Sequence, residues 1–128
     1  MRSLAREVVF KVIFSRLFNP SDEGLFVALS RELNDKDKDF AKSLLNSVEK
    51  NMDKYLSEIE NLSIGYTLCR VINTDKCALL IGMAELNDFP ETDKATIIDE
   101  AVKLSAKFST ENSTNFVNGI LAKYSRSI

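Results

Sequence analysis

The stretch from residue 97 to 124, IIDEAVKLSAKFSTENSTNFVNGILAKY, predicts two helices joined by a polar turn. In its first half, apolar and small side chains recur at three- and four-residue steps, the spacing of one helix face; these are Ile98, Ala101, Val102, Ser105 and Phe108. Residues 109–113 break the pattern with hydroxyl and amide side chains, which cap helices. The apolar pattern then resumes with Phe116, Val117, Ile120, Leu121 and Tyr124.

The same spacing extends over the whole chain and predicts an all-α protein. A length of 128 residues favours one domain over 1–128, large enough to bury a core. Only four Gly and two Pro leave little room for the turns of a sheet protein. We predict about seven helices in one compact bundle, over 3–18, 23–33, 35–62 with a bend near Asn51, a short one within 63–71, 75–87, 92–108 and 112–126.

The helix expected at 75–87 has no charged or strongly polar side chain from Cys77 to Ala84. A helix that is apolar around its whole circumference is normally central and enclosed. Gly82 in its middle indicates that another helix approaches closely. In the last helix we expect Gly119 to have the same role and Asn118 to be a buried, hydrogen-bonded amide.

The first helix has an aliphatic face for the core and a second, more polar side that carries three aromatic rings. At 100° per residue, Phe10, Phe14 and Phe18 fall on that second side. We expect Phe10 and Phe18 to pack within the protein. Phe14 is expected to be exposed or interfacial.

The charge is distributed unevenly along the chain. The net charge is −2, yet residues 1–16 carry +3, residues 103–128 carry +3, and the middle carries −8. If the two ends pack side by side, they form a mildly basic face on an acidic body. Such a face attracts phosphates, whereas the acidic remainder discourages non-specific binding.

The composition argues against most enzyme classes. There is no histidine, which removes Ser–His–Asp and Cys–His catalysis and the commonest metal ligand. We find no glycine-rich phosphate loop and expect no catalytic residue, metal or cofactor. Cys69 and Cys77 lack a CxxC partner and are predicted to be reduced, buried thiols. No apolar run reaches membrane-spanning length, so the expected location is the cytoplasm.

Cations and aromatic rings occur together at both ends of the chain. Single-stranded RNA is held by cations on its backbone and by aromatic planes under its unstacked bases. The first helix offers Arg2, Arg6, Lys11 and Phe14, and the last helix offers Phe116. This combination suggests RNA binding, although Phe116 also suits a place in the core.

Three blocks of the sequence resemble the NusB family. DEAVKLSAKF (99–108), followed by a polar turn and NFVNGILAKY (115–124), is similar to that family's C-terminal signature. AREVVFKVIF (5–14) resembles its opening helix, and DKCALLIGMAEL (75–86) resembles its central helix. The blocks come in family order and at family spacing, so the resemblance covers nearly the whole chain.

The resemblance implies two packed helical subdomains and a role in bacterial transcription antitermination. Members of the family bind the boxA element of nascent ribosomal RNA transcripts together with the ribosomal protein NusE, and help to assemble a complex on RNA polymerase. By position, the resemblance assigns RNA binding to Arg2, Arg6, Phe14, Asn112 and Phe116. It assigns the NusE surface to Asp75 and Leu79.

The sequence also departs from the family pattern. Ser3 and Leu4 interrupt the usual run of arginines, and Thr114 and Asn115 replace a histidine and a lysine. Asn112 stands where aspartate is frequent. Because each lost cation weakens RNA binding, we expect weak binding by the protein alone, with NusE supplying part of the affinity.

Two alternatives and one open question remain. The first alternative is a helical protein–protein scaffold whose RNA binding is weak or lost. The second is a domain of a ribosomal RNA methyltransferase, which is disfavoured because the chain contains no catalytic motif. The oligomeric state is open between monomer and homodimer, and a dimer would be able to hide the RNA face.

Overall fold

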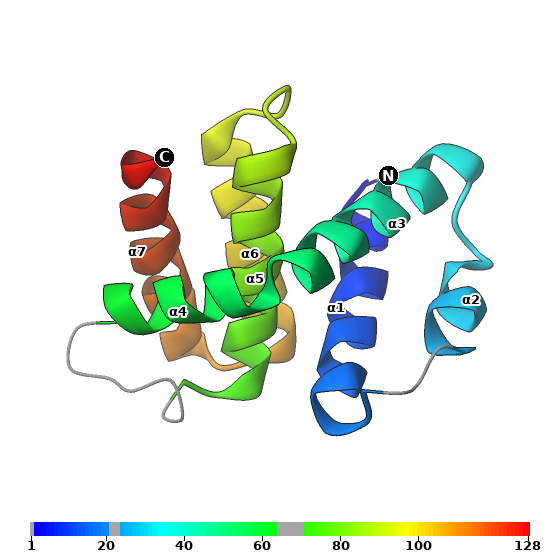
Figure 1. Cartoon of the computed structure of the whole chain (residues 1–128), viewed down its shortest axis with the longest axis horizontal. Helices are drawn as coiled ribbons and strands as arrows, with labels where there is room; N and C mark the ends of the chain where they lie inside the picture. Colours follow the sequence, from blue (N-terminus) through cyan, green and yellow to red (C-terminus); the bar gives the residue numbers. More distant parts are fainter. Residues whose placement is uncertain (1, 21–23, 64–70) are drawn as a thin grey trace.

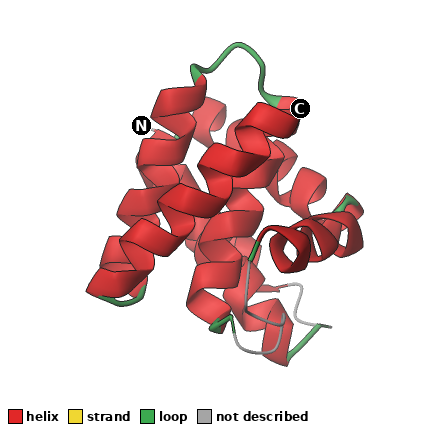
Figure 2. Ribbon diagram, turned by 90° about the vertical axis from the view of Figure 1, so that its left-hand side faces the viewer, coloured by secondary structure: helices red, strands yellow, loops and turns green. Residues whose placement is uncertain are grey.

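The structure is a computed structural model that describes residues 2–20, 24–63 and 71–128. These residues form helices and connecting loops, without a strand (Figure 2). The helices are α1 (Arg2–Phe18), α2 (Gly24–Ser30), α3 (Asp35–Lys50), α4 (Met52–Leu62), α5 (Asn73–Asp88), α6 (Lys94–Phe108) and α7 (Glu111–Ser127). The all-α prediction is confirmed. The helix expected between residues 63 and 71, together with Cys69, lies outside the described residues.

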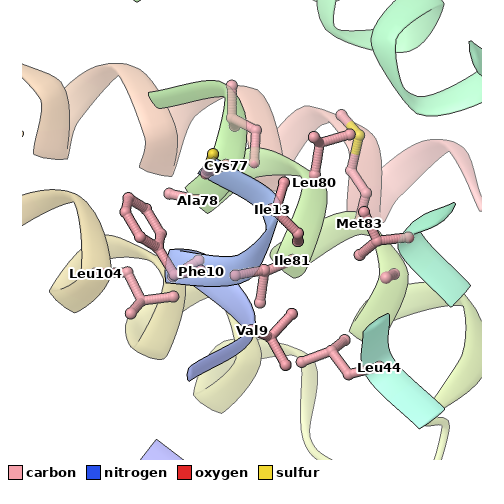
Figure 3. Close-up of a cluster of buried hydrophobic side chains, with 14 of the residues drawn as sticks. Val9, Phe10, Ile13, Leu44, Cys77, Ala78, Leu80, Ile81, Met83 and Leu104 are labelled. Carbon is pink, nitrogen blue, oxygen red and sulfur yellow. The ribbon is translucent and has the colours of Figure 1, made fainter. Parts of the chain in front are cut away.

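Helix α5 is the centre of the bundle. It packs against α1, α3, α4, α6 and α7, and every residue from Cys77 to Leu86 is buried. The prediction of an enclosed central helix is therefore confirmed. Figure 3 shows Ile81 and Leu80 of α5 among Val9 and Ile13 of α1 and Leu44 of α3. Burial also raises the pKa of the Cys77 thiol from 9.0 to about 12.

The remaining helices form two groups on either side of α5. Helices α1, α2 and α3 lie on one side, and α6 and α7 form an antiparallel pair on the other (Figure 1). Helix α4 continues from α3 after a break at Asn51, where a bend was expected, and packs against α5 and α7. The first and last helices thus lie in different groups, and α6 is the element of the second group that reaches α1.

The glycine and asparagine predictions have different outcomes. A Cβ atom on Gly82 would lie 2.6 Å from Cδ1 of Leu121, so the expected close approach of another helix is confirmed. A Cβ atom on Gly119 would meet nothing within 4 Å, and Asn118 is exposed. Both expectations for α7 are therefore wrong, because this stretch of the helix faces outward.

The aromatic side of α1 is only partly covered. Phe10 is buried and stacks on Phe108 of α6, with ring centroids 4.5 Å apart. Phe14 is half-buried, in line with the interfacial role expected for it. Phe18 is 66% exposed, contrary to the prediction, because it is the last residue of α1 and extends beyond the bundle.

Side-chain capping begins two of the helices. The Asn34 side chain accepts a hydrogen bond from the Asp37 amide at 2.8 Å and begins α3. The Asp93 side chain does the same for α6. Thr74 lies in the first turn of α5, which begins at Asn73. Its hydroxyl contacts Ser109 at the end of α6.

Candidate nucleic-acid interface

Arg6 points into the protein. Its side chain is 5% exposed, and Nη2 donates a hydrogen bond to Oε2 of Glu85 at 2.8 Å. Oε2 of Glu100 lies 3.6 Å from Nη1. Glu85 is itself 1% exposed, and a buried carboxylate requires such a partner. Arg6 is therefore a buried counterion between α1, α5 and α6, which corrects its expected placement as a surface cation facing RNA.

Arg2 is exposed at the opposite end of α1 from Phe14. Its guanidinium lies 4.4 Å from the centre of the Phe40 ring, and Nη1 donates to Oγ1 of Thr92 at 3.2 Å. Exposed contacts of this kind are weak, so the charge can still attract a phosphate. Phe14 lies twelve positions after Arg2, about 18 Å along the helix axis. One strand has to run along α1 to reach both.

Phe14 lines a pocket of about 290 Å³ between α1, α5 and α6. The other residues of this pocket are Phe10, Lys11, Thr74 and Phe108. Three aromatic rings thus surround a space whose rim carries an exposed lysine. Aromatic faces and a nearby ammonium group are what an unstacked base and its phosphate require. We call this the Phe14 pocket.

Asn112 and Phe116 lie in a second pocket of about 210 Å³, at the start of α7. The two predicted RNA residues therefore do come together. Asp75, predicted to contact a partner protein, lines the same pocket. The remaining lining residues are Val71, Ile72, Thr110 and Ser113. We call this the Phe116 pocket.

A network of hydroxyl groups connects the two pockets. Thr74, which lines the Phe14 pocket, donates to Oγ of Ser109 at 2.9 Å. Ser109 in turn donates to Oδ1 of Asp75 at 2.8 Å and lies 2.9 Å from Oγ of Ser113. Asp75 and Ser113 line the Phe116 pocket. The network fixes the first turns of α5 and α7, and so holds the two pockets next to each other.

The residues predicted for the partner surface are mostly inaccessible. Leu79 is 0% exposed and Asp75 is 6% exposed. Leu79 points into the core because α5 is enclosed on all sides, so its assignment to a partner surface is wrong. Asp75 keeps only an edge on the Phe116 pocket. Ile72, 48% exposed beside it, is an accessible apolar side chain that sequence reasoning missed; its place just before the helix gave no periodic signal.

The expected basic face is weaker than the charge count suggests. The two basic ends do meet, since Nζ of Lys107 on α6 lies 2.6 Å from Oε1 of Glu7 on α1. That contact neutralises one lysine. Arg16 pairs with Glu49 at 2.5 Å. Lys11 is exposed and forms no ion pair within the described residues, so it is the cation best placed beside the Phe14 pocket.

No helix among the described residues is both long enough and apolar enough to cross a membrane.

Comparisons with known proteins agree on one family. The model of the NusB family matches residues 2–126. The transcription antitermination protein NusB of Natranaerobius thermophilus is 29% identical over 126 residues, covering 94% of this chain and 91% of that protein. A solved structure of T. maritima NusB superposes with a TM-score of 0.91 at 26% identity, covering 98% of this chain and 91% of that one.

A further solved structure contains bound nucleic acid. It holds antitermination factors NusB and NusE in complex with double-stranded RNA, and it matches with a TM-score of 0.86 at 25% identity. The match covers 99% of this chain and 97% of that one. With the family match over nearly the whole sequence and the same fold in the solved structures, this chain belongs to the NusB family.

Proposed function

We propose that this protein is a transcription antitermination factor that binds boxA-type single-stranded RNA of ribosomal RNA transcripts together with NusE. It acts by binding rather than by catalysis, in the cytoplasm, as part of an antitermination complex on RNA polymerase. Family membership supports the general role. The observation that carries the RNA site is the pair of aromatic-lined pockets connected by the hydroxyl network.

The two pockets suit a single strand better than a duplex. Phe14 and Phe116 each offer a half-buried ring in a concave surface, where an unstacked base fits against the ring face. The hydroxyls between them bond to one another and to Asp75, which holds the two pockets in place. Lys11, and Arg2 further along α1, are available to the backbone. We assign RNA binding to Arg2, Phe14, Asn112 and Phe116, and we assign Arg6 the positioning of α1.

For NusE, we propose the surface around the start of α5. Ile72 is its exposed apolar contact, and Asp75 contributes through the edge that it keeps on the Phe116 pocket. Because this surface adjoins the Phe116 pocket, bound NusE and bound RNA touch each other there. This adjacency explains how a partner would raise the affinity of a face with few available cations.

The proposal is tested by fluorescence anisotropy on a labelled boxA RNA, with and without NusE, against a scrambled RNA. We expect binding that is tight and sequence-selective only with NusE present. Phe116→Ala is expected to weaken it about tenfold or more, as loss of a stacked base does. The matched control is Phe26→Ala, which removes another half-buried ring from α2. Equal effects of the two variants, or equal affinity for both RNAs, contradict the proposal.

A second candidate function is a helical protein–protein scaffold with weak RNA binding. This candidate is favoured because both arginines near the start of α1 contact other side chains of the protein. Arg6 is buried against Glu85, and Arg2 lies over the Phe40 ring. The same experiment distinguishes the two candidates. If the protein binds NusE but its affinity for RNA stays weak and does not depend on the RNA sequence, the protein is a scaffold. Ile72→Asp is expected to abolish NusE binding under either candidate.

A further inference from the structure

The outer face of α7 carries three asparagines at successive three-residue steps, at positions 112, 115 and 118. Residues spaced in this way are neighbours on a helix surface. All three are exposed, and within the described residues none of their side-chain amides has a hydrogen-bond partner. Each amide carries two donor hydrogens and an acceptor oxygen. This part of the helix therefore presents a row of uncommitted polar groups of one kind.

The row lies between concave surfaces. A groove of about 450 Å³ runs between α6 and α7; Ile98 and Val102 supply its apolar surface, and Asn115 and Asn118 lie along it. A smaller pocket of about 200 Å³ on the other side of Asn115 also includes Phe116. Phe116 lines both this pocket and the Phe116 pocket, and Asn115 lines both this pocket and the groove, so the three hollows adjoin one another around α7.

These hollows are open, and one of them carries a lysine. Gly119 has nothing within 4 Å of where a Cβ atom would lie, so a flat group can approach the helix backbone there. Lys123, one turn further along the pocket, is exposed and forms no ion pair within the described residues. The carboxylate on the opposite rim, Asp99, pairs with Lys103 at 3.4 Å. Figure 1 shows α7 at the outer edge of the bundle, on the side of α5 away from α1.

We infer that the groove between α6 and α7 reads bases of a single-stranded RNA that crosses α7 from the Phe116 pocket, past the smaller pocket that Lys123 lines. Asn115 and Asn118 bond to the edges of one or two unstacked bases, and Lys123 contacts a phosphate. Side-chain amides are suited to this, since asparagine pairs with two atoms of an adenine edge at once. The inference rests on the proposed RNA binding, which it extends to a sequence-reading element outside the Phe14 and Phe116 pockets.

The test compares single variants of the full-length protein with NusE bound, using labelled boxA RNA and versions shortened from each end. Asn115→Ala and Asn118→Ala are each expected to weaken binding to the full RNA about tenfold, in line with the loss of a bidentate base contact. Neither should affect an RNA that lacks the nucleotides of the groove. The matched control is Asn46→Ala, an exposed asparagine on α3, which packs against α1, α4 and α5.

Salt dependence separates the two kinds of contact. Lys123→Gln is expected to reduce the slope of log affinity against log salt by about 0.7, the value for one phosphate contact with a single strand. The asparagine variants should leave that slope unchanged, because an amide carries no charge. A parallel NMR titration follows the side-chain NH2 signals of Asn115 and Asn118, which are assigned from the alanine variants and should shift on addition of RNA.

The outcomes distinguish this inference from the function on which it rests. If wild type binds boxA RNA, Phe116→Ala weakens binding, and both asparagine variants behave like Asn46→Ala, the groove inference is wrong and the proposed function stands. If the wild-type protein with NusE binds no RNA, both the groove inference and the proposed function are wrong. If the NH2 signals shift with NusE alone and not with RNA, the groove is a protein-binding surface and the inference is overturned.

Discussion

At the scale of single residues, the buried contact of Arg6 changes the role that its position in the sequence predicts. A cation near the start of a helix was expected to face RNA, yet it lies between Glu85 and Glu100 in the core. Its partner Glu85 is 79 positions away along the chain, so no local pattern in the sequence reports the pairing. The charge type was predictable, whereas the direction of the side chain depends on how α1 packs on α5.

Removal of Arg6 is expected to destabilise the protein because it leaves Glu85 buried without a counterion. Arg6→Ala should lower the free energy of unfolding by about 3–5 kcal/mol, measured by urea denaturation. The paired replacement of Arg6 and Glu85 by Met should recover much of that loss, because no buried charge remains. A loss below about 1 kcal/mol in the single variant contradicts the buried pairing.

Cys77 should make stability depend on alkaline pH. Its folded-state pKa is raised to about 12 by burial, so the unfolded thiol ionises first as the pH rises. This contribution is therefore fully present below about pH 9 and is lost progressively toward pH 12. Two proteins are compared, both with Cys69→Ser, of which one retains Cys77 and the other carries Cys77→Ala. Between pH 8 and pH 10.5, the urea midpoint should fall further in the protein that retains Cys77. Equal falls in the two proteins exclude this contribution.

At the scale of elements, the contact between α5 and α7 is set by a single glycine. Gly82 lies against Leu121, a side chain that is itself 0% exposed and has little room to move. Helix boundaries and the enclosed position of α5 were predictable, because they follow from hydrophobic spacing within one segment. The outward direction of Asn118 and Gly119 was not predictable, since the apolar residues around them equally suit a helix covered on both sides.

The two glycines are expected to respond in opposite directions to the same substitution. Gly82→Ala should reduce stability by about 1–3 kcal/mol, because its Cβ atom overpacks against Leu121. Gly119→Ala should increase stability by up to about 1 kcal/mol, because its methyl group meets open space and alanine favours helix. Thermal denaturation of both variants checks this pair. A Gly82→Ala variant as stable as wild type shows that Leu121 has room to shift.

At the scale of the whole molecule, few cations remain available on the proposed RNA face. Lys107 and Arg6 are paired with acidic side chains, which leaves Arg2, Lys11 and Lys123. The candidate site could be predicted only in part for the same reason. Asn112 and Phe116 share a helix turn and were found together, but the pairing of charges between distant helices appears only in the folded chain.

We therefore expect a shallow salt dependence for the complex with boxA RNA and NusE, once the contribution of NusE alone has been subtracted. Three phosphate contacts to a single strand correspond to a slope of about −2 in log affinity against log salt. Arg2→Ala should reduce the magnitude of this slope by about 0.7 and should leave the preference for boxA RNA over a scrambled RNA unchanged. A slope several times steeper implies cations that the folded chain does not offer on this face.

The shared position of α5 has a consequence for how the protein unfolds. Both groups of helices bury their apolar faces on that one helix, so separation of either group uncovers apolar surface of α5. Partial opening that releases either half therefore exposes the other, and the chain should denature as one cooperative unit. Backbone amides at the middle of α5 should then exchange with deuterium only through global unfolding, while those of α2 exchange through local fraying.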